Sequence, residues 1–411
     1  MGNRISESNP EAATLPPLRS SRWKRRLGNL ALIAGSCIFA LVIAEIVFRA
    51  IYYFPQPQFL RMDDVVGHRL RAGISGYYVE EGFSHYKISS RSLRDREYSA
   101  AKPPGIFRVA VLSDSYCEAL QVGLDQTFHK IVAARLRQVE LMNFGVSGYG
   151  TAQEFLTYTH YARPFAPQLV LLVICSGNDI SDNSRALSGG YPRSYFFLED
   201  GRLELDNSFR QSRRFWLLRR WGPLYYFVTD HSALAESLDR WRRRLAQRRA
   251  KQSREENQST SATIEAGLSR GIFGPPATPE LREAWEVTER LILELQRATR
   301  DDGTSLAIMT ATMAAQVDPQ VRAQTAREHP DWDSDYADRR IRQFAESHGI
   351  PCLVLAPGFL EYQKKTGRRL HGFGNASRGH WNAEGHRLAA EMLQQFLAER
   401  RLIPPEHLPG P

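Results

Sequence analysis

Residues 168–179 read QLVLLVICSGND, and no other stretch of the 411-residue chain points so directly to its architecture. We predict a strand at 168–175, because its residues from 169 onward are apolar without interruption, which is typical of a strand covered on both faces in a parallel sheet. The last four residues, SGND, are small or polar and indicate a turn at the end of that strand. The stretch therefore predicts a buried strand that brings polar side chains to one edge of a sheet.

Short apolar runs and helical patterns alternate around this strand. Further strands are predicted at 108–112, 141–144, 304–310 and 352–355. Helical periodicity occurs at 127–139, 151–161, 280–300, 338–349 and 384–400. Strand–helix alternation with buried strands favours a doubly wound α/β sandwich, in which helices cover both faces of a parallel sheet.

Two segments depart from this alternation. Residues 184–275 hold an aromatic stretch followed by a very basic, Gln/Ser-rich stretch, and we interpret them as an insertion in a domain that spans 106–400. Residues 55–105 are rich in turn formers, Tyr and charge, and we interpret them as a linker and lead-in.

The composition is that of a globular protein, with 42% hydrophobic and 24% charged residues, which excludes a wholly disordered or collagen-like chain. A mean hydropathy of -0.41 excludes several membrane spans. The net charge is +9, and basic residues concentrate in the first 26 residues and in 210–254. The four cysteines show no metal-ligand spacing, so neither a zinc site nor a disulfide framework is predicted: Cys37, Cys117, Cys175 and Cys352.

One apolar segment near the N-terminus predicts a membrane anchor. Residues 27–48 contain a single charge, Glu45, and as a helix they span about 30 Å, the thickness of a bilayer core. Five cations precede them: Arg19, Arg22, Lys24, Arg25 and Arg26. Because positive residues stay inside, we expect a cytoplasmic tail (1–26), an anchor (27–54) in a bacterial-type inner membrane, and an extracytoplasmic domain.

Two other interpretations of this segment are weaker. A cleaved signal peptide would have a shorter apolar core, and a buried helix of a soluble protein would not explain the cations at one end.

Polar side chains follow three of the predicted strands, at the carboxyl edge where α/β proteins place their active residues. Ser115 follows 108–112, the glycine-rich GVSGYG follows 141–144, and Asn178 follows 169–175. His380 stands just before the last predicted helix. A serine nucleophile needs a base within hydrogen-bond reach, and we expect Ser115 and His380 to fill these roles.

An oxyanion hole would complete such a site. We expect its donors to be the backbone N–H of Ser115, the N–H of Gly148 and the side-chain amide of Asn178. Each residue has a simpler interpretation when taken alone: Ser115 as a helix N-cap, and Gly148 and Asn178 as turn residues. Asp179 is expected to hold its turn through bonds to the backbone. This chemistry requires no metal and no organic cofactor, and no ligand cluster suggests one.

These blocks, in this order, resemble the SGNH/GDSL hydrolase family: SDS at 113–115, NFGVSGYGTAQE at 143–154, GND at 177–179 and the C-terminal histidine block. The resemblance covers most of 88–186 and 280–398. It implies a flavodoxin-like three-layer α/β/α fold and ester hydrolysis or acyl transfer. The HWN at 380–382 and the membrane-anchored layout also look like the alginate-type O-acetyltransferase branch, which acts on extracytoplasmic polysaccharide. The implied substrate is an acyl ester of a glycan or lipid.

The sequence departs from the family pattern at two places. Ser113 replaces the Gly before Asp-Ser, and Ser377 and Arg378 occupy the positions where the family has an Asp before its histidine. An acid orients the imidazole and stabilises its charged form, whereas a nearby arginine would lower the histidine pKa. Three alternatives follow: a Ser-His dyad whose ring is oriented by a carbonyl or by Ser377, a carboxylate arriving from elsewhere, or a weakened site.

Three functions are therefore weighed. The first is a membrane-anchored serine esterase or O-acyltransferase, the second a catalytically weakened relative that binds glycan or lipid, and the third a tethered scaffold whose basic insertion binds partners. The basic stretch 239–254 suits anionic lipid or an acidic glycan, and equally a solvated helix face or a disordered lid. Nucleic acid is not expected as a partner, because the anchor places this stretch outside the cytoplasm. We expect the first function.

Overall fold

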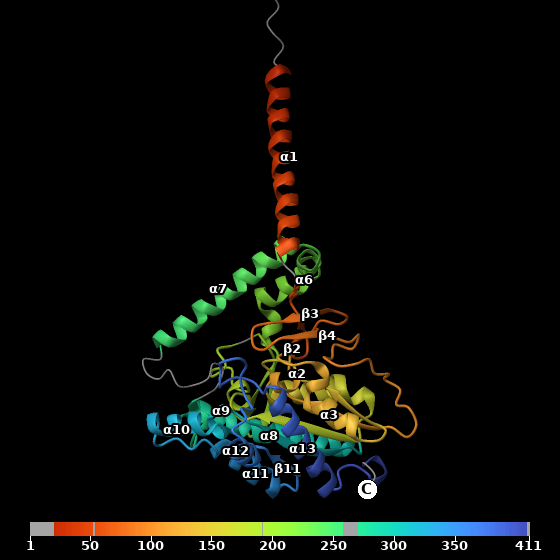
Figure 1. The fold of residues 1–411 in the computed structure, drawn as a ribbon, viewed down its shortest axis with the longest axis vertical. Helices are drawn as coiled ribbons and strands as arrows, with labels where there is room; N and C mark the ends of the chain where they lie inside the picture. The colour runs from red at the N-terminus through yellow and green to blue at the C-terminus, as the bar shows by residue number, and fades with distance from the viewer. Residues whose placement is uncertain (1–19, 52–53, 191, 258–269, 409–411) are drawn as a thin grey trace, which may run out of the picture.

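The computed structural model describes residues 20–51, 54–190, 192–257 and 270–408. Figure 1 shows one long helix, α1 (Ser20–Ile51), standing on an α/β domain. The predicted cytoplasmic tail up to residue 19 and residues 52–53 of the predicted anchor lie outside the described residues.

A five-stranded parallel sheet forms the centre of the domain. Its strands are β5 (Phe107–Leu112), β6 (Val139–Asn143), β7 (Leu169–Cys175), β10 (Ser305–Ala311) and β11 (Cys352–Val354). They are ordered β11-β10-β7-β5-β6, and every neighbouring pair is parallel. In chain order this is the 2-1-3-4-5 arrangement of flavodoxin-like folds. The predicted flavodoxin-like sandwich is confirmed.

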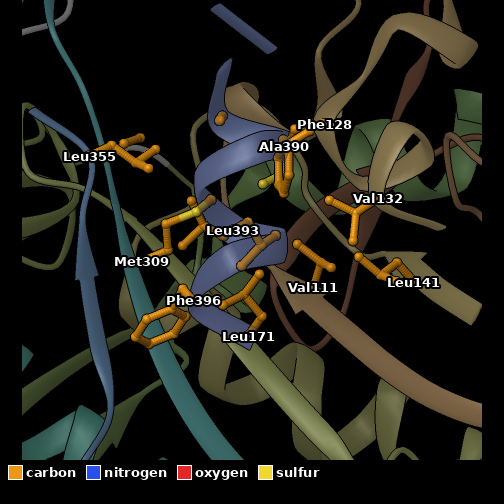
Figure 2. Packing of buried hydrophobic residues seen from close by; sticks show 14 of the residues in the cluster. Val111, Phe128, Val132, Leu141, Leu171, Met309, Leu355, Ala390, Leu393 and Phe396 are labelled. Carbon is orange, nitrogen blue, oxygen red and sulfur yellow. The ribbon is translucent and has the colours of Figure 1, made fainter. Parts of the chain in front are cut away.

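Helices cover both faces of the sheet. One layer contains α3 (Phe128–Arg135), α12 (Ala356–Thr366) and α13 (Ala383–Glu399), and the other contains α4 (Thr151–Thr157), α8 (Pro279–Asp301) and α11 (Tyr336–Ser347). Alternate strand residues therefore serve opposite cores: Val111 packs in the first layer and Leu112 in the second. Figure 2 shows the first core, in which Leu393 and Phe396 of α13 lie over the sheet. Burying a side chain of this size stabilises the fold by about 1.5–3 kcal/mol.

Short helices follow the strands at the carboxyl edge. They are α2 (Ser115–Glu118), α5 (Asp179–Asp182), α9 (Ala314–Val317) and α10 (Pro319–Glu328). The predicted helix 127–139 was too long: α3 ends at Arg135, because Val139 already pairs with Phe107 in the sheet. Helices α10 and α12 were not predicted, and each has a proline in its first turn, where the missing N–H costs no helical hydrogen bond.

The segment interpreted as a linker and lead-in is folded onto the domain. It forms two antiparallel hairpins, β1 (Leu60–Asp63) with β2 (Gly67–Leu70) and β3 (Ser75–Tyr78) with β4 (Ser84–Lys87). Its buried residues Leu70 and Ile88 share a core with Leu120 and Leu156. The lead-in is thus part of the domain and not a free linker.

The described part of the predicted insertion contains one hairpin and two long helices. The hairpin β8 (Tyr195–Glu199) and β9 (Arg202–Asp206) packs on α8 through Leu198 and Leu203. Helices α6 (Arg213–His231) and α7 (Ala233–Asn257) meet at the base of α1 (Figure 1). Residues 258–269 of the insertion lie outside the described residues.

Among the described residues, one helix is long and apolar enough to cross a membrane, Arg22–Ile51, and none of its apolar window is buried. A helix of this kind near the N-terminus is a membrane span or a signal sequence. The cations Arg22, Lys24, Arg25 and Arg26 lie exposed in its first turns.

Candidate active site

Ser115 and His380 meet at the carboxyl edge of the sheet although 265 positions separate them. The Oγ atom of Ser115 lies 2.8 Å from Nε2 of His380. Ser115 begins α2, but Asp114 caps this helix, since its Oδ1 accepts the N–H of Tyr116 at 2.9 Å. The interpretation of Ser115 as an N-cap is therefore wrong, and its hydroxyl faces the imidazole instead.

The position of His380 depends on the residue that follows it. Trp381 is fully buried and donates its indole N–H to Oγ1 of Thr312 at 2.8 Å, just past the end of β10. Its backbone forms an isolated bridge with His371. The ring of Tyr116 packs 5.1 Å from the ring of His380. These contacts hold the loop of His380 against the end of β10 and against α2, the short helix that carries Ser115.

A carboxylate from the lead-in, Glu81, completes this arrangement. Its Oε2 lies 2.6 Å from Nδ1 of His380, and its Oε1 accepts the backbone N–H of the same residue at 2.7 Å. Burial raises the pKa of Glu81, but the hydrogen bonds and charge of His380 outweigh this and hold the pKa below its usual range. Glu81 is therefore ionised at neutral pH.

The sequence leaves open which group orients the histidine, and the structure places a distant carboxylate there. The expectation for Ser377 is wrong, because Nδ1 of His380 faces Glu81. Arg378 does not crowd the ring: its guanidinium donates to Gln324 at 3.2 Å. No local spacing relates residue 81 to residue 380, so the sequence contains no signal that would have identified Glu81.

A glycine lets the carboxylate reach this position. Gly379 has φ +110°, and a Cβ atom there would overlap Oε1 of Glu81. On the other side, the β3–β4 turn is pressed against the segment after α2, where Ser84 donates its hydroxyl to the carbonyl of Leu120 at 2.5 Å. The hairpin that carries Glu81 is thus tied to the segment after α2, and the missing side chain at Gly379 leaves room for the carboxylate.

The three expected oxyanion donors, Ser115, Gly148 and Asn178, follow three adjacent strands, β5, β6 and β7. Gly148 has φ +77° and open space beside it, which suits close approach of a substrate. The Nδ2 atom of Asn178 lies 3.3 Å from Asp114 and 3.2 Å from Asp182.

An arginine connects the two loops that carry Gly148 and Asn178. The Arg193 guanidinium donates to the carbonyl of Gly148 and pairs with Asp182 at 2.7 Å. Because Asp182 also accepts from Asn178, one side chain of the insertion helps to set the relative position of both expected donors. The sequence alone does not indicate this role of Arg193.

Two buried polar side chains form hydrogen bonds with Ser147, the residue before Gly148. Ser147 donates its hydroxyl to Glu118, and burial raises the pKa of that carboxyl to about 7. The Nε2 atom of His68 lies 2.9 Å from the carbonyl of Ser147. Burial lowers the pKa of His68 to about 4, so its ring is neutral and donates to this carbonyl.

Other residues near the site contribute to packing and to turns. Asp179 accepts the N–H of Cys175 at 2.8 Å, which confirms its expected role in holding the turn. Cys117 is fully buried, and burial raises the pKa of its thiol well above the usual range, so it is not a second nucleophile. His386 is buried, with its ring stacked on Phe128. Among the described residues, no group of three or more His, Cys, Asp or Glu side chains could hold a metal ion.

A scan against protein-family models finds no match for this chain, and a search of curated proteins finds none. Several solved structures are similar. The acetyl xylan esterase AlAXEase has 12% identity and a TM-score of 0.38, over 70% of this chain and 98% of that one. A catalytic mutant of Axe2, an acetylxylan esterase from Geobacillus stearothermophilus, has 12% identity and a TM-score of 0.37, over 72% and 96%.

A member of the lipolytic protein G-D-S-L family from Veillonella parvula DSM 2008 has 10% identity and a TM-score of 0.35, over 70% of this chain and 97% of that one. A lipase/acylhydrolase from Enterococcus faecalis has 8% identity and a TM-score of 0.36, over 74% and 100%. The similar structures thus include a protein of the GDSL family that the four sequence blocks resemble.

Proposed function

We propose that this chain is a serine esterase or O-acyltransferase of the SGNH/GDSL type, with Ser115 as nucleophile, His380 as base and Glu81 as the acid. The observation that carries the proposal is one line of hydrogen bonds, 2.6 Å from Glu81 to Nδ1 of His380 and 2.8 Å from Nε2 to Ser115. In such a triad the acid holds the tautomer that leaves Nε2 able to accept a proton.

The first half of the reaction acylates the enzyme. As Oγ of Ser115 attacks the ester carbonyl carbon, Nε2 of His380 takes the hydroxyl proton, and Glu81 stabilises the resulting imidazolium. The negative charge on the carbonyl oxygen is met by the N–H groups of Ser115 and Gly148 and the amide of Asn178. Collapse of this intermediate breaks the bond to the alcohol, which leaves with the proton from Nε2.

The second half releases the acyl group. His380 takes a proton from water or from a sugar hydroxyl, whose oxygen attacks the acyl-enzyme carbonyl. The bond to Oγ then breaks, and Ser115 recovers its proton from His380. Water yields a free acid and makes the enzyme an esterase, whereas a sugar hydroxyl yields a new ester and makes it a transferase.

The anchor is part of the proposal: α1 is a single span with its basic end in the cytoplasm and the candidate site outside. Most of its large apolar side chains are exposed, and it points away from the domain in Figure 1. Glu45 in its last third accepts the N–H groups of Ala233 at 2.9 Å and Leu234 at 3.1 Å. A cleaved signal peptide would leave the start of α7 without this partner, which favours a retained anchor.

The proposed substrate is an acyl ester of a glycan or lipid within reach of the membrane. The alternative function, a catalytically weakened protein that binds such molecules, was motivated by the missing acid before the histidine. The ionised Glu81 beside His380 argues against that alternative.

The test uses the full chain in detergent or nanodiscs. Ser115→Ala should abolish turnover of p-nitrophenyl acetate and labelling by a fluorophosphonate, while the melting temperature stays unchanged. Ser305→Ala is the matched control, because Ser305 is exposed at the amino end of β10, the opposite edge of the sheet. Undiminished turnover in Ser115→Ala would sink the proposal. Mass spectrometry of products formed with a glycan acceptor separates hydrolysis from transfer.

A further inference from the structure

Helix α6 has one buried face and, opposite to it, an exposed apolar face. The inner face contacts the domain through the buried residues Phe215, Gly222 and Thr229. The outer stripe, spaced four, three and four residues apart, consists of Leu217, Trp221, Leu224 and Val228. Trp221 and Leu224 are 52% and 56% exposed. A helix on a protein surface normally has a polar outer face, so this stripe is an unusual feature.

The stripe is accompanied by further exposed apolar side chains on α6 and on the first turns of α7. We define the α6–α7 apolar patch by its large exposed apolar side chains: Trp216, Leu217, Leu218, Trp221, Leu224, Phe227, Val228, Leu238 and Trp241. Exposed apolar side chains gathered in this number mark a surface that contacts something other than water.

The position of the patch identifies what it contacts. Glu45 of α1 accepts the hydroxyl of Ser232 at 2.8 Å, and Arg49 donates to the carbonyl of His231 at 2.6 Å. Both bonds tie the α6–α7 corner to the last two turns of α1, as Figure 1 shows. Glu45 stands six residues before the end of α1, which is about 9 Å along the helix axis. If α1 spans the bilayer, this corner lies at the outer membrane–water interface.

We propose that the α6–α7 apolar patch inserts into the outer interface of the bilayer that α1 spans. This rests on the anchor part of the proposed function. Tryptophan is favoured at that depth, where its ring is in the apolar region and its N–H in the wet one. Exposed arginines beside the stripe, Arg213, Arg214 and Arg220, extend charged ends toward lipid phosphates. The occupant is therefore lipid, including anionic lipid.

The lead-in connects this patch to the candidate site. Arg71 pairs with Asp230 of α6, and the backbone N–H of Gln56 donates to Glu236 of α7 at 2.5 Å. The same lead-in continues into the β3–β4 turn that carries Glu81. A membrane contact at α6 thus holds the site at a set height above the bilayer, so that the ester it acts on is one presented near the membrane surface.

Photocrosslinking of the full chain tests the contact directly. The chain is reconstituted in nanodiscs of phosphatidylcholine and phosphatidylglycerol, with p-benzoylphenylalanine replacing either Trp221 or Leu224. Lipid adducts are expected at both positions. No adduct is expected at the control position Gln395, an exposed residue of α13 on the far side of the domain (Figure 1). Crosslinks to a second copy of the chain, or no lipid adduct at 221 and 224, would overturn the proposal.

A second experiment separates this proposal from the enzymatic one. In nanodiscs, Trp221→Glu with Leu224→Glu should speed amide hydrogen exchange in 213–231 several-fold, while turnover of soluble p-nitrophenyl acetate stays unchanged. Leu205→Glu is the control, since Leu205 is an exposed residue of β9. Unaltered exchange in the double variant would overturn the membrane contact whether or not Ser115 is catalytic.

Discussion

The Oε2 atom of Glu81 lies 2.6 Å from Nδ1 of His380, across 299 positions of sequence. The second oxygen of the same carboxylate accepts the backbone N–H of His380 at 2.7 Å. One side chain therefore holds both the ring and the backbone of the histidine. An acid in this position fixes the tautomer and the orientation of the imidazole. The hairpin that supplies it belongs to the lead-in, so the proposed chemistry depends on the lead-in.

Glu81→Gln should lower kcat for a soluble ester by about 10²- to 10⁴-fold, because a neutral amide neither stabilises the imidazolium nor enforces the same tautomer. KM should change little, since Glu81 acts through His380 and not on the substrate. Steady-state kinetics with p-nitrophenyl acetate measure both, and the rate of fluorophosphonate labelling of Ser115 should fall with kcat.

Two variants control for this change. Glu80→Gln alters the exposed neighbouring carboxylate and should leave kcat unchanged. Glu81→Asp keeps the charge and should restore part of the activity. If Glu81→Gln retained full kcat and an unaltered pH–rate profile, Glu81 would have only a structural role.

Gly379→Ala should reduce activity because it moves the carboxylate of Glu81. The added Cβ would overlap Oε1 of Glu81 and displace the carboxylate from His380. Gly374→Ala is the matched control: it also replaces a glycine of positive φ in this loop, but with no atom near the new Cβ. Both variants should lose about 1–2 kcal/mol of stability from the left-handed backbone, and kcat should fall only in Gly379→Ala. Equal kcat in the two variants would contradict this account.

Asn178→Ala should lower kcat by about 10²- to 10³-fold with a small change in KM, as expected when one donor to a developing oxyanion is removed. Thermal unfolding should change little, because Asn178 is partly exposed and its amide bonds, at 3.2 and 3.3 Å, are long. A matching rise in KM at constant kcat would instead assign Asn178 to ground-state binding.

Stability should fall as the pH drops below 6.5, in part through His386. Burial lowers the pKa of His386 to about 3, with a smaller contribution from the charge of Arg94. Between pH 6.5 and about 3 the unfolded chain binds a proton at this residue that the folded chain does not, so stability is lost toward acid. His386→Gln removes this proton-binding group from the unfolded chain. The slope of the unfolding free energy against pH should therefore fall by up to about 1.4 kcal/mol per pH unit.

Melting temperatures of the two proteins at pH 5 and pH 8 provide the measurement. The exposed His348→Gln is the control and should keep the slope of the unaltered chain. A slope that is the same in all three proteins would show that His386 does not stay neutral in the folded state.

Strand identity and the edge that carries the polar blocks were both predictable. Residues 169–175 form β7 almost as predicted, because an uninterrupted apolar run is stable only when both faces of the strand are covered. Parallel pairing then places Ser115, Gly148 and Asn178 at the same edge of the sheet, and the strand order makes their three strands neighbours. The ends of helices and strands were less predictable. The helical periodicity at 127–139 did not show where α3 ends and β6 begins, because β6 is defined by the pairing of Val139 with Phe107, a residue distant in sequence.

The amino-acid sequence by itself therefore determined the parallel α/β sandwich, the apolar N-terminal helix and the residues at the carboxyl edge. These features follow from the periodicity of apolar residues and from the direction of the strands. Only the folded chain could bring Glu81 to His380, since no spacing rule reaches across 299 positions. Only the folded chain could likewise decide which face of α6 packs on the domain. The buried face of that helix, with Phe215, Gly222 and Thr229, is less apolar than the outer stripe, and the contact of the α6–α7 corner with Glu45 leaves the stripe exposed next to the anchor.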